Sequence, residues 1–293
     1  MTLNLSKLEP IDYLVIGHIT QDMTPEGYQL GGTASFSSLT ALSMGLRVGV
    51  LTSCSPEADL GALDGITVVR HASDQCTTFE NLYFPEGRIQ YLHHLATPLD
   101  ASMIPTTWLN TPIVQLSPSS QEVDPKIVRA FPNSLIGVTP QGWLREWDQE
   151  GRVRPCDWLE SQFVLEQSTA AVLSIEDLGG DESRVDDLVT SIRILVITEG
   201  NAGARLYWNG DLRRFRPPSV VEVDPIGAGD IFAAAFFARL HATKDPWEAA
   251  RFATQLAARS VTRRRLDGVP TPEEVQAALL LSLIHISEPT RPY

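Results

Sequence analysis

Short apolar runs rich in β-branched residues alternate with segments of helical spacing along most of the chain. The runs that we interpret as buried strands are Tyr13 to Gly17, Val48 to Thr52, Ile113 to Leu116, Leu135 to Val138, Ala171 to Ser174 and Ile192 to Thr198. The helical segments are Ala34 to Met44, Pro125 to Phe131 and Ser183 to Ser191. This order predicts an α/β fold, a three-layer α/β/α arrangement with a mostly parallel central sheet. In such sheets ligands bind at the carboxyl ends of the strands.

One region breaks this alternation. The segment from Cys76 to His93 has two strand-like halves around Pro85, Glu86 and Gly87, which predicts a hairpin. The segment from Gly27 to Gly32 could add a short strand. Residues of about 23–32 and 76–95 would then form a small β flap, or lid, over the main sheet. An ordinary hairpin at the edge of the main sheet is the alternative.

Composition is that of a globular protein with a sizeable core, because 43% of the 293 residues are hydrophobic and 20% are charged. We expect one main domain over residues 1–280. The formal net charge is −13, and the basic residues cluster only at Arg263, Arg264 and Arg265. The footprint of a nucleic-acid-binding surface is therefore missing, and we expect no nucleic acid partner.

Cysteine use and hydropathy bear on the compartment. Cys54, Cys76 and Cys156 are widely separated and lack the spacing of metal ligands, which suits a reducing environment. The opening residues lack the apolar region of a signal peptide, and no apolar run approaches the roughly 20 residues of a membrane span. We expect a cytoplasmic protein without membrane attachment.

The last residues look foreign to the rest of the chain. Thr271 as N-cap, Pro272 at the first helical position and Glu274 in a capping box predict a helix to at least Leu280. The segment from Leu281 to Tyr293 resembles the translated read-through of a sequencing adapter. We expect residues 281–293 to be a non-native tail and exclude them from fold reasoning.

The stretch from Asp224 to Leu240 places a glycine-containing turn directly before an apolar helix, with Asp230 at the junction. A helix N-terminus exposes unpaired N–H groups and partial positive charge, so Gly227, Ala228 and Gly229 could cradle a phosphate. A carboxylate beside that phosphate could accept the proton of a substrate hydroxyl. The helix terminus also predicts that Asp230 is ionised at neutral pH. Glycines that serve packing alone are the alternative.

This stretch resembles the C-terminal signature of the ribokinase-like carbohydrate kinases, also called the PfkB type. The resemblance implies a central sheet with a β lid, ATP as donor, Asp230 as catalytic base, and an anion hole at Gly227, Ala228 and Gly229. It also implies that Asp224 belongs to the cofactor-binding loop. Pro225 and Ile226 stand where the family usually has threonines, in a loop that binds a monovalent cation such as K⁺ in some members.

The resemblance extends to a candidate acceptor site near the start of the chain. Asp22 follows the first strand, where the family has an Asp that binds sugar hydroxyls, although a solvated loop carboxylate is the alternative. Gly31 and Gly32 match the family's Gly-Gly signature, where backbone lies close to the substrate. Phe36 replaces the family's usual Asn, and its ring either faces the acceptor or joins the core.

One further segment, just past a predicted strand end, has no firm counterpart in the family. It carries Gln141, Trp143 and Arg145, which either shape the substrate pocket or pack a long loop. We include Gln141 among the candidate acceptor-binding residues.

Two segments expected to bind the phosphate donor also resemble motifs of the family. Ser174 and Asp177 stand where the family has an Asn-x-x-Glu motif that organises Mg²⁺ and phosphate through water, with Glu176 as the fallback. A solvated helix start is the alternative. Beyond them, Thr198, Gly200 and Gly203 resemble the strand and turn that border ATP in the family, although a plain β-turn would use the same glycines.

These features predict an ATP-dependent kinase that phosphorylates a hydroxyl, expected to be a primary alcohol, of a sugar or sugar-like small molecule. A nucleoside kinase of the same superfamily is one alternative, favoured if the Phe36 ring faces a base. A non-catalytic metabolite-binding relative is another, since Ser174 and Ile226 depart from the family pattern. The short spacing from Asp22 to Gly31 leaves little room for a large dimerising lid, which favours a monomer over a homodimer.

Overall fold

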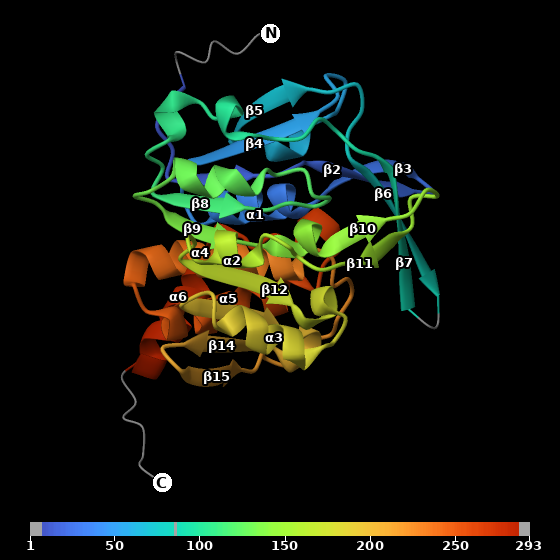
Figure 1. Cartoon of the computed structure of the whole chain (residues 1–293). Coiled ribbons are helices and arrows are strands. Elements are labelled where there is room, and N and C mark those ends of the chain that lie inside the picture. Colours follow the sequence, from blue (N-terminus) through green and yellow to red (C-terminus); the bar gives the residue numbers. More distant parts are fainter. Residues whose placement is uncertain (1–7, 85–86, 287–293) are drawn as a thin grey trace.

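A nine-stranded sheet forms the centre of the molecule (Figure 1). The structure, a computed structural model, describes residues 8–84 and 87–286. The strands run in the spatial order β15-β14-β13-β12-β9-β8-β1-β4-β5. Their bounds are β1 Tyr13–Ile16, β4 Val48–Cys54, β5 Thr67–Ala72, β8 Ile113–Leu116, β9 Leu135–Val138, β12 Ala170–Ser174, β13 Ile194–Thr198, β14 Ala204–Trp208 and β15 Asp211–Phe215.

Strand direction confirms the mostly parallel sheet. Every neighbouring pair from β5 across to β13 is parallel, and only β14 and β15 run antiparallel at one edge. The chain leaves β1 toward β4 and β5 on one side, and later fills the other side from β8 onward. Ligands of open α/β sheets bind beyond the carboxyl ends of the strands where the order reverses, and here that point lies between β1 and β8.

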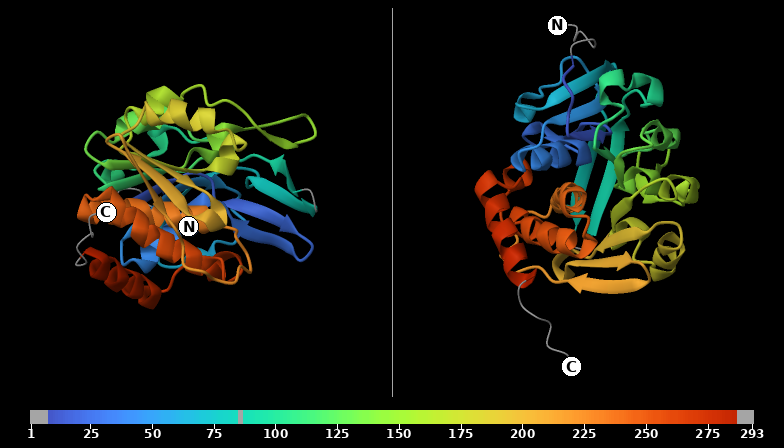
Figure 2. Two further views of the ribbon diagram at one scale, coloured as in Figure 1. Left: turned by 90° about the horizontal axis from the view of Figure 1, so that it is seen from below. Right: turned by 90° about the vertical axis from the view of Figure 1, so that its left-hand side faces the viewer.

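Helices cover both faces of the sheet, which confirms the three layers (Figure 2). One face carries α1 Thr33–Ser43, α4 Ala228–Thr243, α5 Pro246–Ser260 and α6 Pro272–Ile286; the other carries α2 Ser161–Leu165 and α3 Glu182–Val189 together with the 3₁₀ segment η5 Pro125–Ala130. The predicted helix from Pro125 to Phe131 is therefore a 3₁₀ segment rather than an α-helix. Its start is set by Asp124, whose side chain accepts from the backbone N–H of Lys126.

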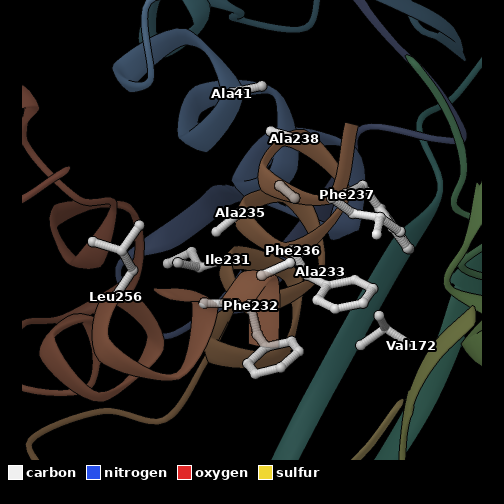
Figure 3. Close-up of a cluster of buried hydrophobic side chains, with 14 of the residues drawn as sticks. Ala41, Val172, Ile231, Phe232, Ala233, Ala235, Phe236, Phe237, Ala238 and Leu256 are labelled. Carbon is white, nitrogen blue, oxygen red and sulfur yellow. The ribbon is translucent and has the colours of Figure 1, made fainter. Parts of the chain in front are cut away.

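Each face of the sheet buries its own core. Along β1, Tyr13 and Val15 point into the core beneath α1, α4 and α5, while Leu14 and Ile16 point into the other. Figure 3 shows the first core around the side chains of α4. Because α4 is apolar on every side, it is buried between the sheet and its neighbouring helices. This burial fixes the position of its N-terminus, which the candidate site uses.

A separate four-stranded sheet projects from the main body and confirms the predicted flap (Figure 1). Its order is β3-β2-β6-β7, with bounds β2 Thr20–Thr24, β3 Gly27–Gly31, β6 Thr78–Phe84 and β7 Gly87–His94. β2 pairs antiparallel with β3 and parallel with β6, so the two predicted parts of the flap form one sheet. The predicted turn residues Pro85 and Glu86 lie outside the described residues.

A hairpin that the sequence analysis did not predict flanks this lid. It consists of β10 Arg145–Trp147 and β11 Val153–Pro155. The N–H of Leu92, on the lid strand β7, donates to the carbonyl of Gly151 at 2.8 Å. Gly151 has φ 83°, and a Cβ there would lie 2.4 Å from the Leu92 oxygen, so the close approach requires glycine. Lid and hairpin are thus joined through backbone.

The C-terminal helix begins as predicted. The Thr271 hydroxyl accepts from the N–H of Glu274, and the Glu274 carboxylate accepts from the N–H of Thr271. The helix continues through Ile286, in agreement with the predicted run to at least Leu280, and so includes residues 281–286 of the expected tail, while residues 287–293 lie outside the described part. Among the described residues no helix combines the length and apolarity that crossing a membrane requires.

Candidate active site

One cavity of about 1100 Å³ opens at the carboxyl ends of the central strands and reaches the lid. Such a volume lies at the upper end of the range for small-molecule sites and leaves room for two ligands. All candidate site residues except Gly31 and Asp224 line it. Those that do are Asp22, Gly32, Phe36, Gln141, Ser174, Glu176, Asp177, Thr198, Gly200, Gly203, Gly227, Ala228, Gly229 and Asp230.

Asp230 lies in the first turn of α4, which begins after Gly227. The N-cap is a glycine without a side chain that could satisfy the first N–H groups of the helix, so these groups can bind a ligand. The Ala228 N–H is an exception, because it donates to the Pro225 carbonyl at 3.2 Å and so holds the turn. Of the backbone N–H groups expected to hold a phosphate, that of Ala228 is therefore already bonded within the protein.

The surroundings of Asp230 raise its pKa to about 6. Desolvation by the enclosing protein is the largest cause, and the nearby Asp177 carboxylate acts in the same direction. A hydrogen bond from the Thr33 hydroxyl and the positive charge of Arg145 act in the opposite direction. The helix terminus led us to expect a stabilised anion, but desolvation outweighs it. At neutral pH the carboxylate is still mostly ionised, as a general base must be.

The glycines at 227 and 229 differ sharply in their surroundings. Gly227 has φ 81°, and a Cβ there would lie 2.3 Å from the ring of Phe36. That ring is 2% exposed and belongs to the core, so it packs against the turn and offers little surface to a base. A Cβ at Gly229 would meet no protein atom within 4 Å. The absence of a side chain at Gly229 therefore leaves open space at the cavity, whereas at Gly227 it makes room for the ring of Phe36.

Asp224 stabilises the turn before α4 through two hydrogen bonds. Its Oδ1 accepts from the N–H of Ile226 at 3.0 Å, and its Oδ2 accepts from the N–H of Arg265 at 3.0 Å. This explains why Asp224 does not line the cavity. It shapes the loop and does not face the ligands.

The candidate acceptor side is built around Asp22 on the lid strand β2. Its Oδ2 accepts from Nη1 of Arg265 at 2.9 Å, and a Cβ on Gly31 would lie 2.9 Å from the same oxygen. Gly31 thus makes room for the carboxylate and does not line the cavity. Gly32, with φ 83°, caps α1 and lies over Thr20, where a Cβ would be 2.9 Å from the hydroxyl oxygen.

The segment after β12 forms a capping box that the sequence predicted only in part. The Ser174 hydroxyl accepts from the N–H of Glu176 at 3.2 Å, and Asp177 Oδ2 accepts from the N–H of Ser174 at 3.0 Å. Asp177 Oδ1 accepts from Gln141 Nε2 at 3.0 Å. Gln141, expected on the acceptor side, is therefore tied to the donor side, while Glu176 is exposed.

The turn after β13 borders the same cavity. Gly203 has φ 98°, and a Cβ there would lie 2.0 Å from the carbonyl oxygen of Phe215. Glycine is therefore required at position 203, so that the chain before β14 can lie against the end of β15. A Cβ at Gly200 would meet nothing within 4 Å, and Thr198 donates to the Leu173 carbonyl at 3.4 Å. Gly200 is thus the glycine of this turn that leaves space at the cavity wall.

Two contacts at the site were missed by sequence reasoning, and one residue was left undecided. Thr33 directly follows the Gly-Gly pair, and this position was the only available signal for its contact with Asp230. Arg265 belongs to the arginine run 263–265, which was read only as a charge cluster. Arg145, left open between pocket and packing, lines the cavity and acts on Asp230 through its charge.

Part of the chain is similar to proteins of known activity. Residues 170–273 match the model of the pfkB family carbohydrate kinases. An inositol 3-kinase of Oryza sativa subsp. japonica is 40% identical over 85 residues, which are 28% of this chain and 21% of that protein. A cytidine kinase of Thermococcus kodakarensis is 24% identical over 251 residues, 78% of this chain and 88% of that protein. The chain thus spans only about a fifth of the inositol 3-kinase it matches.

Solved structures share the whole fold. A pyrophosphate-dependent kinase of the ribokinase family, complexed with a pyrophosphate analog and myo-inositol, superposes with a TM-score of 0.76 at 19% identity, covering 90% of this chain and 99% of that one. A ribokinase of Arabidopsis thaliana complexed with ribose and ATP gives a TM-score of 0.68 at 14% identity, covering 92% and 99%. The chain thus has the fold of the ribokinase-family structures, and its residues 170–273 match the model of the pfkB family carbohydrate kinases.

Proposed function

We propose that this protein is a phosphotransferase that moves the γ-phosphoryl group of ATP to a hydroxyl of a sugar or sugar-like polyol. The observation that carries the proposal is the placement of Asp230. It stands in the first turn of a buried helix whose N-terminus opens into a cavity, and the lid carboxylate Asp22 lines the same cavity. Residues suited to act as a base, to hold an anion and to bind an acceptor thus line one cavity, which supports the proposal.

The chemistry follows from this arrangement. Asp22 binds hydroxyls of the acceptor, and Asp230 accepts the proton of the attacking hydroxyl while its oxygen bonds to phosphorus. The bond from the γ-phosphorus to the bridging oxygen breaks, and ADP leaves with the electron pair. The first amides of α4 and the positive charge of Arg145 stabilise the charge on the transferring group. Lid closure over the cavity excludes water.

The donor side suits a hydrated Mg²⁺, which the family implies. Glu176 and Asp177 offer the hard oxygen atoms that this ion prefers. Both oxygens of Asp177 already accept N–H groups of the protein, which favours contact through water over direct ligation. When bound, the ion would neutralise donor phosphate charge. We assign no K⁺ to the Asp224 loop, because both oxygens of that carboxylate accept backbone N–H groups.

Among acceptors we favour a neutral sugar or cyclic polyol over a nucleoside. The relatives include inositol 3-kinases as well as a cytidine kinase, so the family alone does not decide. The nucleoside alternative depended on a free Phe36 ring, and that ring is packed against Gly227. We also propose a cytoplasmic location.

A panel of acceptors with two donors tests the proposal. Purified protein is incubated with ATP and Mg²⁺, or with pyrophosphate and Mg²⁺, and with pentoses, hexoses, inositols or nucleosides, and phosphorylated product is quantified. We expect turnover with ATP and a sugar or inositol. Turnover with pyrophosphate alone would correct the donor, and turnover of nucleosides alone would correct the acceptor. Binding without turnover across the panel would support the non-catalytic alternative and overturn the proposal.

A further inference from the structure

A single arginine connects two parts of the site that are far apart in the sequence. Arg265 lies in the short 3₁₀ segment Arg265–Gly268 between α5 and α6. Its Nη1 donates to Asp22 Oδ2 at 2.9 Å, and its backbone N–H donates to Asp224 Oδ2 at 3.0 Å. The base of the lid and the loop before α4 are thus held by the same residue.

The backbone of Arg265 is held in an unfavourable conformation. Its φ of 48° lies in the left-handed region, which costs free energy in any residue with a side chain. Such a conformation persists when surrounding contacts determine it, and here hydrogen bonds fix both the backbone and the side chain. The neighbour Arg264 is exposed and keeps the usual negative φ of −88°.

The ion pair fixes the direction of the Asp22 carboxylate. The side chains of Asp22 and Arg265 are only 12% and 25% exposed, so solvent screens their attraction weakly. The backbone of Gly31 lies against the same oxygen that Arg265 binds. The carboxylate is therefore held between a guanidinium group and a glycine before any acceptor arrives, which lowers the entropy lost on binding.

We propose that Arg265 is a positioning residue for the acceptor: it holds Asp22 in the orientation that binds acceptor hydroxyls and ties the base of the lid to the loop before α4. The inference rests on the proposed kinase function for its kinetic consequence. Its structural consequence, a firmly held lid base, is independent of any turnover.

The side chain and backbone roles of Arg265 can be separated by substitution. Arg265→Ala removes the guanidinium group but keeps the N–H that donates to Asp224, so the anion loop retains its support. Arg265→Lys keeps the positive charge but lacks the planar guanidinium group. Arg264→Ala is the matched control, because it removes the same charge from the exposed residue directly before this segment.

Steady-state kinetics with ATP and the preferred acceptor test the kinetic consequence. For Arg265→Ala we expect a rise of about tenfold or more in the acceptor KM, with the donor KM within about twofold of the wild type. Arg265→Lys should recover part of the loss, and Arg264→Ala should match the wild type. Equal rises in both KM values, or equal effects of the two alanine variants, would overturn the positioning role.

Amide hydrogen exchange tests the structural consequence in the protein without substrates. In Arg265→Ala, exchange should become faster across residues 20–31 and stay unchanged across residues 204–215, which lie in the edge strands of the main sheet. Unchanged exchange across 20–31 would show that the ion pair does not hold the lid base. If no acceptor of the panel is turned over, the kinase proposal fails while this experiment still decides the inference.

Discussion

The proposed acceptor side and the proposed donor side of the cavity are built in different ways. On the acceptor side, Asp22 is 12% exposed at its side chain and held between Arg265 and the backbone of Gly31. On the donor side, Gly200 and Gly229 leave open space around the position of a Cβ, and Glu176 is exposed. The proposed acceptor side is therefore shaped by packed side chains, whereas the proposed donor side presents backbone with open space around it.

Asp230 stands between the two sides, and its replacement should have the largest effect. Asp230→Asn keeps the shape of the side chain but removes the base, so we expect kcat to fall by about a thousandfold or more. Donor binding, measured by calorimetry, should change little. Asp211→Asn, an exposed substitution on β15, is the control. Near-normal turnover in Asp230→Asn would show that this carboxylate is not the base.

The two glycines of the α4 turn provide the sharpest test of the comparison. Gly229→Ala should leave the melting temperature nearly unchanged, because its Cβ meets no protein atom, but should raise the donor KM by about tenfold or more. Gly227→Ala should lower the free energy of unfolding by about 2 kcal/mol or more, because of its positive φ and the clash with Phe36. The test is to measure thermal unfolding and the donor KM for both variants. A destabilised Gly229→Ala with normal donor KM would contradict the assignment.

The pH dependence reports on the environment of Asp230. Because burial raises its pKa to about 6 and the base acts in the ionised form, kcat/KM should fall about tenfold per pH unit below pH 6. Thr33→Val removes a hydrogen bond that favours the ionised form, so the fall should begin at higher pH, by roughly one pH unit.

Ser37 offers a matched control for that experiment. Its hydroxyl donates to the backbone carbonyl of Asp230 at 3.3 Å and not to the carboxylate. Ser37→Ala should therefore leave the acid limb of the pH profile in place, even if it changes the overall rate. Equal displacement of the limb in both variants would mean that Thr33 does not act through the carboxylate.

The smallest effect is expected at Gln141. Gln141→Leu removes the hydrogen bond to Asp177, so the donor KM should rise only about twofold to fivefold while the acceptor KM stays constant. Gln162→Leu, which removes a comparable surface bond to Glu166, is the control. A larger effect on the acceptor KM would return Gln141 to the acceptor side, where the sequence analysis placed it.

Local patterns predicted much of the fold. The strands from Ile113 to Leu116 and from Leu135 to Val138 were predicted with their observed bounds, because buried parallel strands are short, continuous apolar runs. The hairpin from Arg145 to Pro155 was missed. Its strands have only three residues each, and half of these residues are charged, so the strands carry no periodic signal.

The site was harder to predict where it depends on distant contacts. The glycine turn and Asp230 are continuous in the sequence and were found together. The partnership of Asp22 with Arg265 joins residues 243 positions apart and leaves no local signal. The raised pKa of Asp230 also escaped prediction, because desolvation depends on the enclosing protein rather than on the helix terminus beside it.

The backbone bond between Leu92 and Gly151 has a consequence for the order of binding events. A shift of the lid strand β7 would act on the Arg145–Pro155 hairpin through this bond, and this hairpin continues directly from the turn that holds Gln141 against Asp177. An acceptor that draws the lid inward would therefore also alter the donor's surroundings. By thermodynamic reciprocity, the donor must then strengthen or weaken acceptor binding by the same factor. The backbone hydrogen bond between Leu92 and Gly151 would thus contribute to cooperative binding of the two substrates.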